Sequence, residues 1–238
     1  MENFTFNRKV LDYAPAFDFN QAQIHELSYH VRYIKNHFPD EWEALERRKL
    51  TGDIDFDVND YFEGNQEQFE IFLNHIEGKK SLEIGCGCIP DTKEFYKVKD
   101  RIVLDPLADN YKKVEEMYFN RSFFEGYTIY NQKAEERIDE LVGKVDGMIY
   151  FQNALDHTDD PLSILDNVSE YAMPGCYLIF FSDIWHIIPP NAGHRSITRS
   201  VPIMDKLFRG MGFRKVFTRK PIRDASKWIE YGAVFIKE

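Results

Sequence analysis

Cysteines and long hydrophobic runs are scarce in this chain of 238 residues. It has three cysteines, which cannot all pair, and Cys86 and Cys88 stand only two positions apart. This argues against a disulfide framework and favours a reduced, cytoplasmic setting. The longest apolar runs, such as residues 177–181, are far shorter than the roughly 20 residues that cross a bilayer. The first residues have neither the basic start nor the apolar core of a signal peptide. We therefore expect a cytoplasmic protein that does not enter the membrane.

Positive charge is also in short supply. Lys and Arg number 30 against 40 Asp and Glu, which gives a formal net charge of −10. A protein that holds nucleic-acid phosphates needs a basic patch, so this balance argues against a nucleic-acid partner and suits a small or cationic ligand better. Hydrophobic residues make up 43% and charged residues 29%, as in ordinary soluble proteins. A chain of this length can bury a core without a metal or a disulfide.

The first third of the chain is predicted to be mainly helical. Hydrophobic residues recur at spacings of three and four across residues 21–38, which is the period of an amphipathic helix. A polar, acidic stretch follows at residues 51–57. A second helix is expected from about residue 65 to residue 75, and it ends before Gly78.

From Lys80 onwards, short apolar segments alternate with helical ones. We expect strands at residues 81–84, 101–104, 128–131, 146–151 and 177–182, and helices at 109–117, 134–141 and 161–171. This alternation predicts a parallel sheet with helices on both faces. The end differs, because a helix at 201–211 is followed by two strands, near 215–219 and at 230–237, without a crossover helix. These two strands are expected to form an antiparallel hairpin at the sheet edge.

The most informative segment is Leu82–Pro90, which reads LEIGCGCIP. A predicted strand ends here, and two glycines allow the chain to turn and to approach a ligand closely before a further helix. In doubly wound sheets, ligands bind at this place, beyond the carboxyl ends of the strands. The dinucleotide fingerprint G-x-G-x-x-G is incomplete, because Pro90 occupies the position of the third glycine. Glu83 would repel a pyrophosphate but attract an ammonium or sulfonium group.

Asp105 closes the next predicted strand. An acid at this place can accept hydrogen bonds from both hydroxyls of a ribose. Together, Glu83 and Asp105 suit a nucleoside with a positively charged tail, and S-adenosylmethionine has that chemistry. On these residues the chain resembles the class I S-adenosylmethionine-dependent methyltransferases, from about Lys80 to the last residue, which is around two thirds of its length.

The resemblance implies a fold and a division of the chain. The expected fold is of the α/β class, with a Rossmann-like, doubly wound sheet of seven strands, mostly parallel with an antiparallel C-terminal hairpin, and an N-terminal helical lid. Residues 1–78 would form the lid or acceptor-binding segment, and residues 79–238 the cofactor-binding domain, with an acceptor-binding insertion at about 183–200. The chain departs from the family pattern at Cys88-Ile89-Pro90, where a further glycine is usual.

The same resemblance implies a set of cofactor contacts. Glu83 would lie near the cofactor's amino group, the glycine loop beside its methionyl part, and Asp105 at its ribose. Segment 132–135 resembles the one that meets adenine, although Lys133 stands where an aspartate is common. Segment 145–157 resembles the strand and loop under the reactive methyl. The residues implied to bind the cofactor are Glu83, Gly85, Cys86, Gly87, Asp105, Pro106, Lys133, Ala134, Glu135, Gln152 and Asn153.

Several residues, mainly histidines, are candidates for catalysis if the acceptor is a hydroxyl, because a base must then remove its proton. His157, with Asp156 beside it, either acts as that base or packs in the loop. His194 lies in the expected insertion and either binds the acceptor, acts as the base or is a solvated loop residue. His186 is a weaker candidate in the same region.

Two other features each have a functional and a structural interpretation. Arg195 and Arg199 either clamp an anionic group of the acceptor or stay exposed. Tyr61 and Phe62 either cover the cofactor's methionyl end or pack in the core.

No metal is expected. His25 and His30 are five positions apart, roughly 140° around a helix, whereas the zinc-protease pattern needs a spacing of four on one face. Residues 156–160 are rich in acids and include His157, so a divalent ion is conceivable there. The run is more simply the start of a helix, where acids meet the positive end of the dipole.

We therefore expect a methyltransferase that uses S-adenosylmethionine and acts on a small molecule. O-methylation is favoured, because histidines sit in the expected loops and no D/N-P-P-Y/F motif of N-methylation is present. The preferred acceptor is a sugar, a nucleotide-sugar or a capsule or glycan precursor, since Asp105-Pro106-Leu107 resembles bacterial glycan methyltransferases. The alternatives are a catalytically silent cofactor-binding partner subunit, a nicotinamide-dependent oxidoreductase, and a nucleic-acid or protein methyltransferase. A homodimer is left open.

Overall fold

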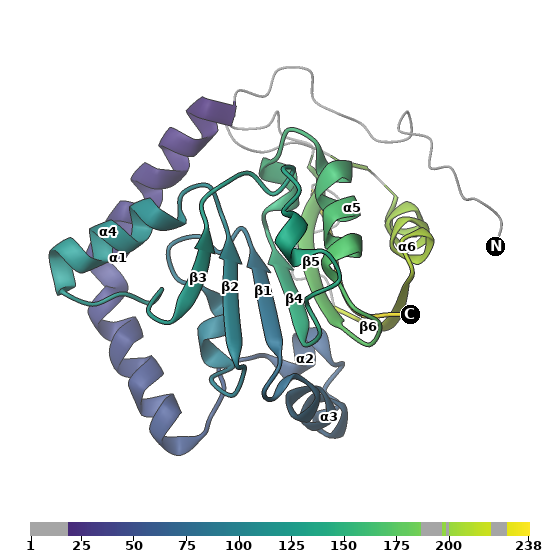
Figure 1. Cartoon of the computed structure of the whole chain (residues 1–238), viewed down its shortest axis with the longest axis horizontal. Coiled ribbons are helices and arrows are strands. Elements are labelled where there is room, and N and C mark those ends of the chain that lie inside the picture. Colours follow the sequence, from purple (N-terminus) through teal and green to yellow (C-terminus); the bar gives the residue numbers. More distant parts are fainter. Residues whose placement is uncertain (1–18, 187–196, 199, 220–227) are drawn as a thin grey trace.

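The structure is a computed structural model, and it describes residues 19–186, 197–198, 200–219 and 228–238. Its centre is a seven-stranded sheet with the strand order β3-β2-β1-β4-β5-β7-β6 (Figure 1). The strands are β1 (Lys80–Ile84), β2 (Asp100–Leu104), β3 (Tyr127–Tyr130), β4 (Met148–Gln152), β5 (Tyr177–His186), β6 (Phe213–Thr218) and β7 (Trp228–Lys237). Every strand that the sequence predicts is therefore present.

The direction of the strands also follows the prediction. β3, β2, β1, β4 and β5 run parallel to one another. β7 lies antiparallel to both β5 and β6, and it is inserted between them. The expected fold class, a doubly wound sheet with an antiparallel hairpin at one edge, is confirmed.

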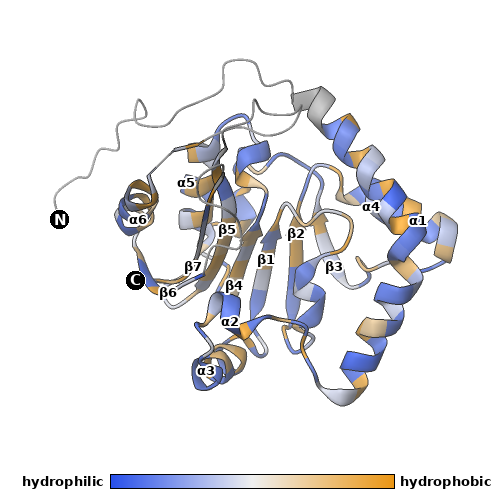
Figure 2. Cartoon of the chain, turned by 180° about the vertical axis from the view of Figure 1, so that it is seen from behind, coloured by the Kyte–Doolittle hydropathy of each residue, from blue (hydrophilic) through white to orange (hydrophobic). Residues whose placement is uncertain are grey.

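Helices cover both faces of the sheet. The α-helices are α1 (Phe19–Thr51), α2 (Val58–Tyr61), α3 (Gln66–Ile76), α4 (Ala108–Phe119), α5 (Pro161–Tyr171) and α6 (Val201–Gly210). On one face α5 and α6 pack against the largest hydrophobic cluster. On the other face α2 and α3 cover the β4, β5 and β7 side, while α1 and α4 cover the β2 side. Figure 2 shows the hydrophobic residues concentrated on the central strands.

Helix α1 is much longer than the amphipathic stripe that predicts it. It runs beside α4 at the β3 edge of the sheet (Figure 1). Ile34, Phe38 and Leu45 are buried in its contact with the sheet. Because these side chains recur along one face, the helix is held to the sheet over several turns. No helix in the described part of the chain is long and apolar enough to span a membrane.

The helix expected at residues 134–141 is absent. The segment is irregular and ends in a short 3-10 helix, η3 (Asp139–Leu141). Side chains of α5 take the backbone groups that a helix there would pair internally. Asn167 donates to the carbonyls of Ala134 and Glu135 at 2.8 and 3.1 Å, and the Tyr171 hydroxyl accepts from Ile138 N–H at 2.7 Å.

The connection from β1 to β2 contains only a 3-10 helix, η2 (Asp91–Glu94), where the sequence suggested a helix after the glycines. The backbone N–H groups of Asp91 and Thr92 donate to the Glu83 carboxylate. Pro90 lacks an N–H of its own, and it precedes this turn. The glycine loop is therefore tied back to the strand instead of leading into an α-helix.

Candidate functional site

A cavity of about 300 Å³ lies beyond the carboxyl ends of the parallel strands. The glycine loop follows β1, Asp105 follows β2, residues 133–135 follow β3, and Asn153 follows β4. All of the residues that the sequence analysis assigns to the cofactor line this one cavity. The cavity lies where doubly wound sheets bind their ligands.

The glycine loop is shaped by two positive backbone angles. Gly85 has φ +66°, and a Cβ at this position would lie 2.2 Å from the Cβ of Ala154. Gly87 has φ +58°, and a Cβ there would lie 3.1 Å from the His30 ring. Side chains rarely adopt this region of φ. Both glycines therefore allow the loop to pass close to its neighbours and leave its backbone facing the cavity.

The Asp105 carboxylate is buried at the cavity wall. It accepts hydrogen bonds from Leu107 N–H at 2.7 Å and from Gly87 N–H at 3.3 Å. Burial raises the pKa of Asp105, while these two bonds oppose the shift. Each carboxylate oxygen has more than one lone pair, so the group can accept further hydrogen bonds from a ligand. It fits the two hydroxyls of a ribose.

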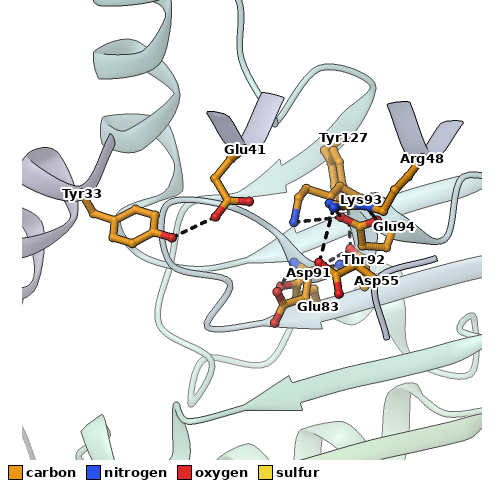
Figure 3. Close-up of polar contacts among 10 residues, drawn as sticks. All are labelled: Tyr33, Glu41, Arg48, Asp55, Glu83, Asp91, Thr92, Lys93, Glu94 and Tyr127. Atoms are coloured by element: carbon orange, nitrogen blue, oxygen red, sulfur yellow. Dashed lines mark hydrogen bonds and ion pairs between the residues drawn. The ribbon is translucent and has the colours of Figure 1, made fainter. Parts of the chain in front are cut away.

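Glu83 is 2% exposed and points toward η2. Its carboxylate accepts hydrogen bonds from Asp91 N–H and Thr92 N–H, both at 2.9 Å, and from the Thr92 hydroxyl at 2.5 Å (Figure 3). Burial, followed by the nearby Asp91 carboxylate, raises the pKa of Glu83 to about 8. The three hydrogen bonds show that Glu83 holds the loop, in addition to lining the cavity.

The segments after β3 and β4 are joined to each other. Lys133 forms an ion pair with Asp159 at 2.9 Å, so its side chain is tied to the loop that follows β4. Glu135 accepts a hydrogen bond from the backbone N–H of Asp159 at 2.8 Å. These contacts fix the position of the loop that follows β4. They also leave Ala134 at the cavity wall.

Tyr61 and Phe62 have different surroundings. The Tyr61 hydroxyl donates to the Gln152 side chain at 2.7 Å, and Gln152 lines the cavity. Phe62 is fully buried in the core beneath α3. Core packing therefore describes both residues, which belong to the same hydrophobic cluster, and the Tyr61 hydroxyl also positions a residue of the cavity wall.

The predicted catalytic residues are only partly described. His157 lines the cavity from the short 3-10 helix η4 (Leu155–His157), and its Nε2 lies 3.8 Å from a carboxylate oxygen of Asp156. Asp156 is 1% exposed. His194 and Arg195 lie outside the described residues, as does Arg199. His186 ends β5, but its side chain is not among those described.

Helix α1 contributes cavity residues that the sequence analysis did not assign. Gln23, Glu26 and His30 line the cavity. His30 contacts Glu26 at 2.8 Å through one ring nitrogen and Cys88 at 3.1 Å through the other. The spacing of these residues places them near one face of a helix, which is a signal in the sequence. That spacing does not say which part of the sheet the face would meet.

A second cavity of about 380 Å³ adjoins the first. His30, Cys86, Asp91 and Tyr150 line both cavities. The other lining residues come mainly from α1, residues 55–56 and η2, and Figure 3 shows the charged ones. Arg48 bonds to Glu94 and lies 3.4 Å from Asp55, and Lys93 lies 3.4 Å from Glu94. Tyr29, Tyr33, Phe56 and Tyr150 supply aromatic surface to the walls.

Within the described ranges, no group of three or more His, Cys, Asp or Glu side chains is placed to hold a metal ion. The acidic run before α5 is used as a helix start. The Asp160 side chain accepts a hydrogen bond from Ser163 N–H at 3.3 Å, which is a typical N-cap contact.

No protein-family model and no curated protein matches the chain. Solved structures do match its fold. A methyltransferase dependent on S-adenosylmethionine from Mesorhizobium loti is 13% identical with a TM-score of 0.53, over 72% of this chain and 96% of that one. A protein from Listeria monocytogenes assigned to the same class is 12% identical with a TM-score of 0.52, over 72% and 97%. A Galdieria sulphuraria protein assigned as a sarcosine dimethylglycine methyltransferase is 14% identical with a TM-score of 0.55, over 72% and 83%.

These similarities define the class of fold. The chain has the fold of the S-adenosylmethionine-dependent methyltransferases. At this level of identity they define nothing finer, since one fold can host many reactions.

Proposed function

We propose that this protein is a methyltransferase that uses S-adenosylmethionine. The observation that carries the proposal is the single cavity beyond β1, β2, β3 and β4, in which the two close-packed glycines meet the buried Asp105 carboxylate. A nucleoside ligand needs both features, because its ribose must be bound and its tail must pass close to backbone. The similarity of the fold to methyltransferases supports the same assignment.

The cavity residues divide into three groups in this proposal. Asp105 binds the ribose hydroxyls, and the backbone at Ala134 meets the adenine. The loop from Gly85 to Gly87 follows the methionyl part, with Gln152 and Asn153 below it. S-adenosylmethionine, when bound, supplies a methyl group attached to a positively charged sulfur. The leaving group is then a neutral thioether. The task of the chain is then mainly to position the acceptor in line with that methyl group.

We propose further that the acceptor is a small hydroxylated molecule, such as a sugar, a nucleotide-sugar or a glycan precursor, and that the second cavity receives it. Its walls combine aromatic side chains with carboxylates, a guanidinium and an ammonium group. Sugars use both kinds of surface, because their C–H faces pack on rings and their hydroxyls hydrogen-bond to charged groups. The four residues common to both cavities support this placement, since the acceptor must lie next to the cofactor.

His157 is the proposed base for the hydroxyl proton. It lines the cofactor cavity and not the second one, so the acceptor hydroxyl would extend from the second cavity into the first to reach it. The nearly inaccessible Asp156 lies beside its Nε2. A neighbouring carboxylate stabilises the imidazolium that forms when histidine takes a proton. His194 remains a proposed second contact to the acceptor, from the part of the chain expected to form the insertion.

The first experiment is calorimetric titration with S-adenosylhomocysteine, the product of the proposed reaction. We expect micromolar binding to the wild type and loss of at least tenfold in affinity for Asp105→Ala, because a buried carboxylate that binds two hydroxyls is removed. Asp100→Ala is the matched control, since Asp100 is exposed at the other end of β2 and should leave binding unchanged.

Two results would contradict the proposal. Binding of NAD(H) with no binding of S-adenosylhomocysteine would indicate a nicotinamide-dependent oxidoreductase instead. Equal affinity of wild type and Asp105→Ala would place the nucleoside elsewhere. If the ligand binds as expected, transfer of labelled methyl to pools of sugars, nucleotide-sugars and amines then identifies the acceptor class. Cofactor binding without transfer to any pool would favour a silent partner subunit.

A further inference from the structure

Glu83 and Asp91 are neighbouring acids with different surroundings. Glu83 stands where the family resemblance places the acid near the cofactor's amino group. In the structure its carboxylate is almost inaccessible and already accepts three hydrogen bonds from residues 91 and 92. A carboxylate that is bonded in this way has little capacity left for a ligand. Its main task is to hold the turn at the start of η2.

Asp91 is the acid that this turn presents. It is an exposed residue, and it lines both cavities at their junction. Figure 3 shows its carboxyl group beside that of Glu83. Within the described residues Asp91 forms no ion pair with a lysine or an arginine, because Lys93 and Arg48 are both directed to Glu94. Among the described residues, Asp91 is therefore not held in an ion pair by a basic side chain.

Besides burial, the nearby Asp91 carboxylate helps to raise the pKa of Glu83, so the two acids repel each other when both are ionised, and a cation bound at Asp91 relieves that repulsion. The methionyl end of the cofactor bears an ammonium group, and the glycine loop that would follow that end leads directly to Asp91. We propose that Asp91 binds the ammonium group of the cofactor and that Glu83 is a positioning residue that holds Asp91 in place. This inference rests on the proposed function.

The test compares two ligands that differ only in the amino group. S-adenosylhomocysteine carries it, and its deamino analogue keeps the carboxylate and the nucleoside. We expect Asp91→Asn to weaken binding of S-adenosylhomocysteine by about tenfold or more, since a charge-assisted contact is lost. The same substitution should leave binding of the deamino analogue unchanged or make it tighter, because the repulsion of its carboxylate is removed.

Glu41→Gln is the control substitution. Glu41 lines only the second cavity, where it accepts a hydrogen bond from Tyr33 at 3.1 Å. It should change neither affinity, whereas a general effect of lost negative charge would appear in both variants. Glu83→Gln should weaken the binding of both ligands to a similar degree, because it loosens the loop and removes no contact to the amino group.

The outcomes separate this inference from the proposed function. If the wild type binds neither ligand, the proposed function fails. The wild type can also bind S-adenosylhomocysteine while Asp91→Asn lowers the affinity for both ligands equally, or for neither. In that case the assignment of the ammonium group to Asp91 is wrong, and the proposed cofactor site is retained. Asp91→Asn is isosteric and keeps the backbone N–H that donates a hydrogen bond to Glu83. A thermal melt of each variant checks that the fold is retained.

Discussion

At the scale of single residues, Gly85 is the position where the backbone leaves least freedom. Alanine there would have φ near +66° and a Cβ only 2.2 Å from that of Ala154. We expect Gly85→Ala to lower the free energy of unfolding by at least about 2 kcal/mol, from backbone strain and overpacking together. Urea denaturation measures this change.

Gly126→Ala separates the two contributions. Gly126 also has a positive φ, of +81°, but a Cβ there would meet nothing within 4 Å. It should cost only the strain of the backbone, about 1 kcal/mol. Equal losses for the two variants would mean that the contact with Ala154 relaxes freely and that the glycine loop is not tightly constrained.

Much of the candidate site could be predicted from the sequence, because it follows the ends of parallel strands. Once the strands are assigned, Gly85, Asp105, Ala134 and Asn153 must come together at one edge of the sheet. Asp91 was not predictable in the same way. Its position depends on how Glu83 binds the following turn, and hydrophobic periodicity carries no information on such a contact.

At the scale of elements, α1 is expected to owe its place to its buried face. Leu45 is 4% exposed in the cluster that joins α1 to the sheet, and Leu50, five residues further on, is 89% exposed. We expect Leu45→Ala to cost about 2–4 kcal/mol in the free energy of unfolding and Leu50→Ala less than about 0.5 kcal/mol. Similar values for both would show that α1 does not unfold together with the sheet.

The elements also show where sequence patterns were insufficient. All strands were predicted because apolar runs bounded by polar turns are typical of a buried parallel sheet. Segment 134–141 has a helical composition, yet Asn167 and Tyr171 of α5 bind its backbone groups. Contacts between segments that lie about thirty residues apart decided the conformation there, and local propensity did not.

At the scale of the whole molecule, buried acids make stability depend on pH. Burial raises the pKa of Glu83 and of Glu115 to about 8, from an ordinary value of 4.5. The folded state therefore holds these protons at pH values where the unfolded state has released them. The contribution of these groups to stability is greatest at pH values below their pKa in the unfolded state, and it falls as the pH rises toward 8. His75 acts in the opposite sense below about pH 6.5, because its pKa is lowered.

We therefore expect the melting temperature of the wild type to fall between pH 6.5 and 8. Glu83→Gln should flatten that decline, because it removes one titrating group. One retained proton lowers the free energy of unfolding by up to about 1.4 kcal/mol per pH unit. Glu115→Gln should have a similar effect, whereas the exposed Glu116→Gln should have none. Parallel curves for wild type and Glu83→Gln would mean that Glu83 is ionised in the folded protein throughout this range.

The order of the strands has a consequence for the newly made chain. β6 is synthesised before β7, yet in the described sheet its neighbour is β7, which also separates it from β5. Until β7 has left the ribosome, β5 offers an open edge and β6 has no strand to pair with. Unpaired edges of this kind are prone to associate with other chains. A pause in translation after β6 would therefore expose an aggregation-prone intermediate, and a chaperone would bind the nascent chain at that edge.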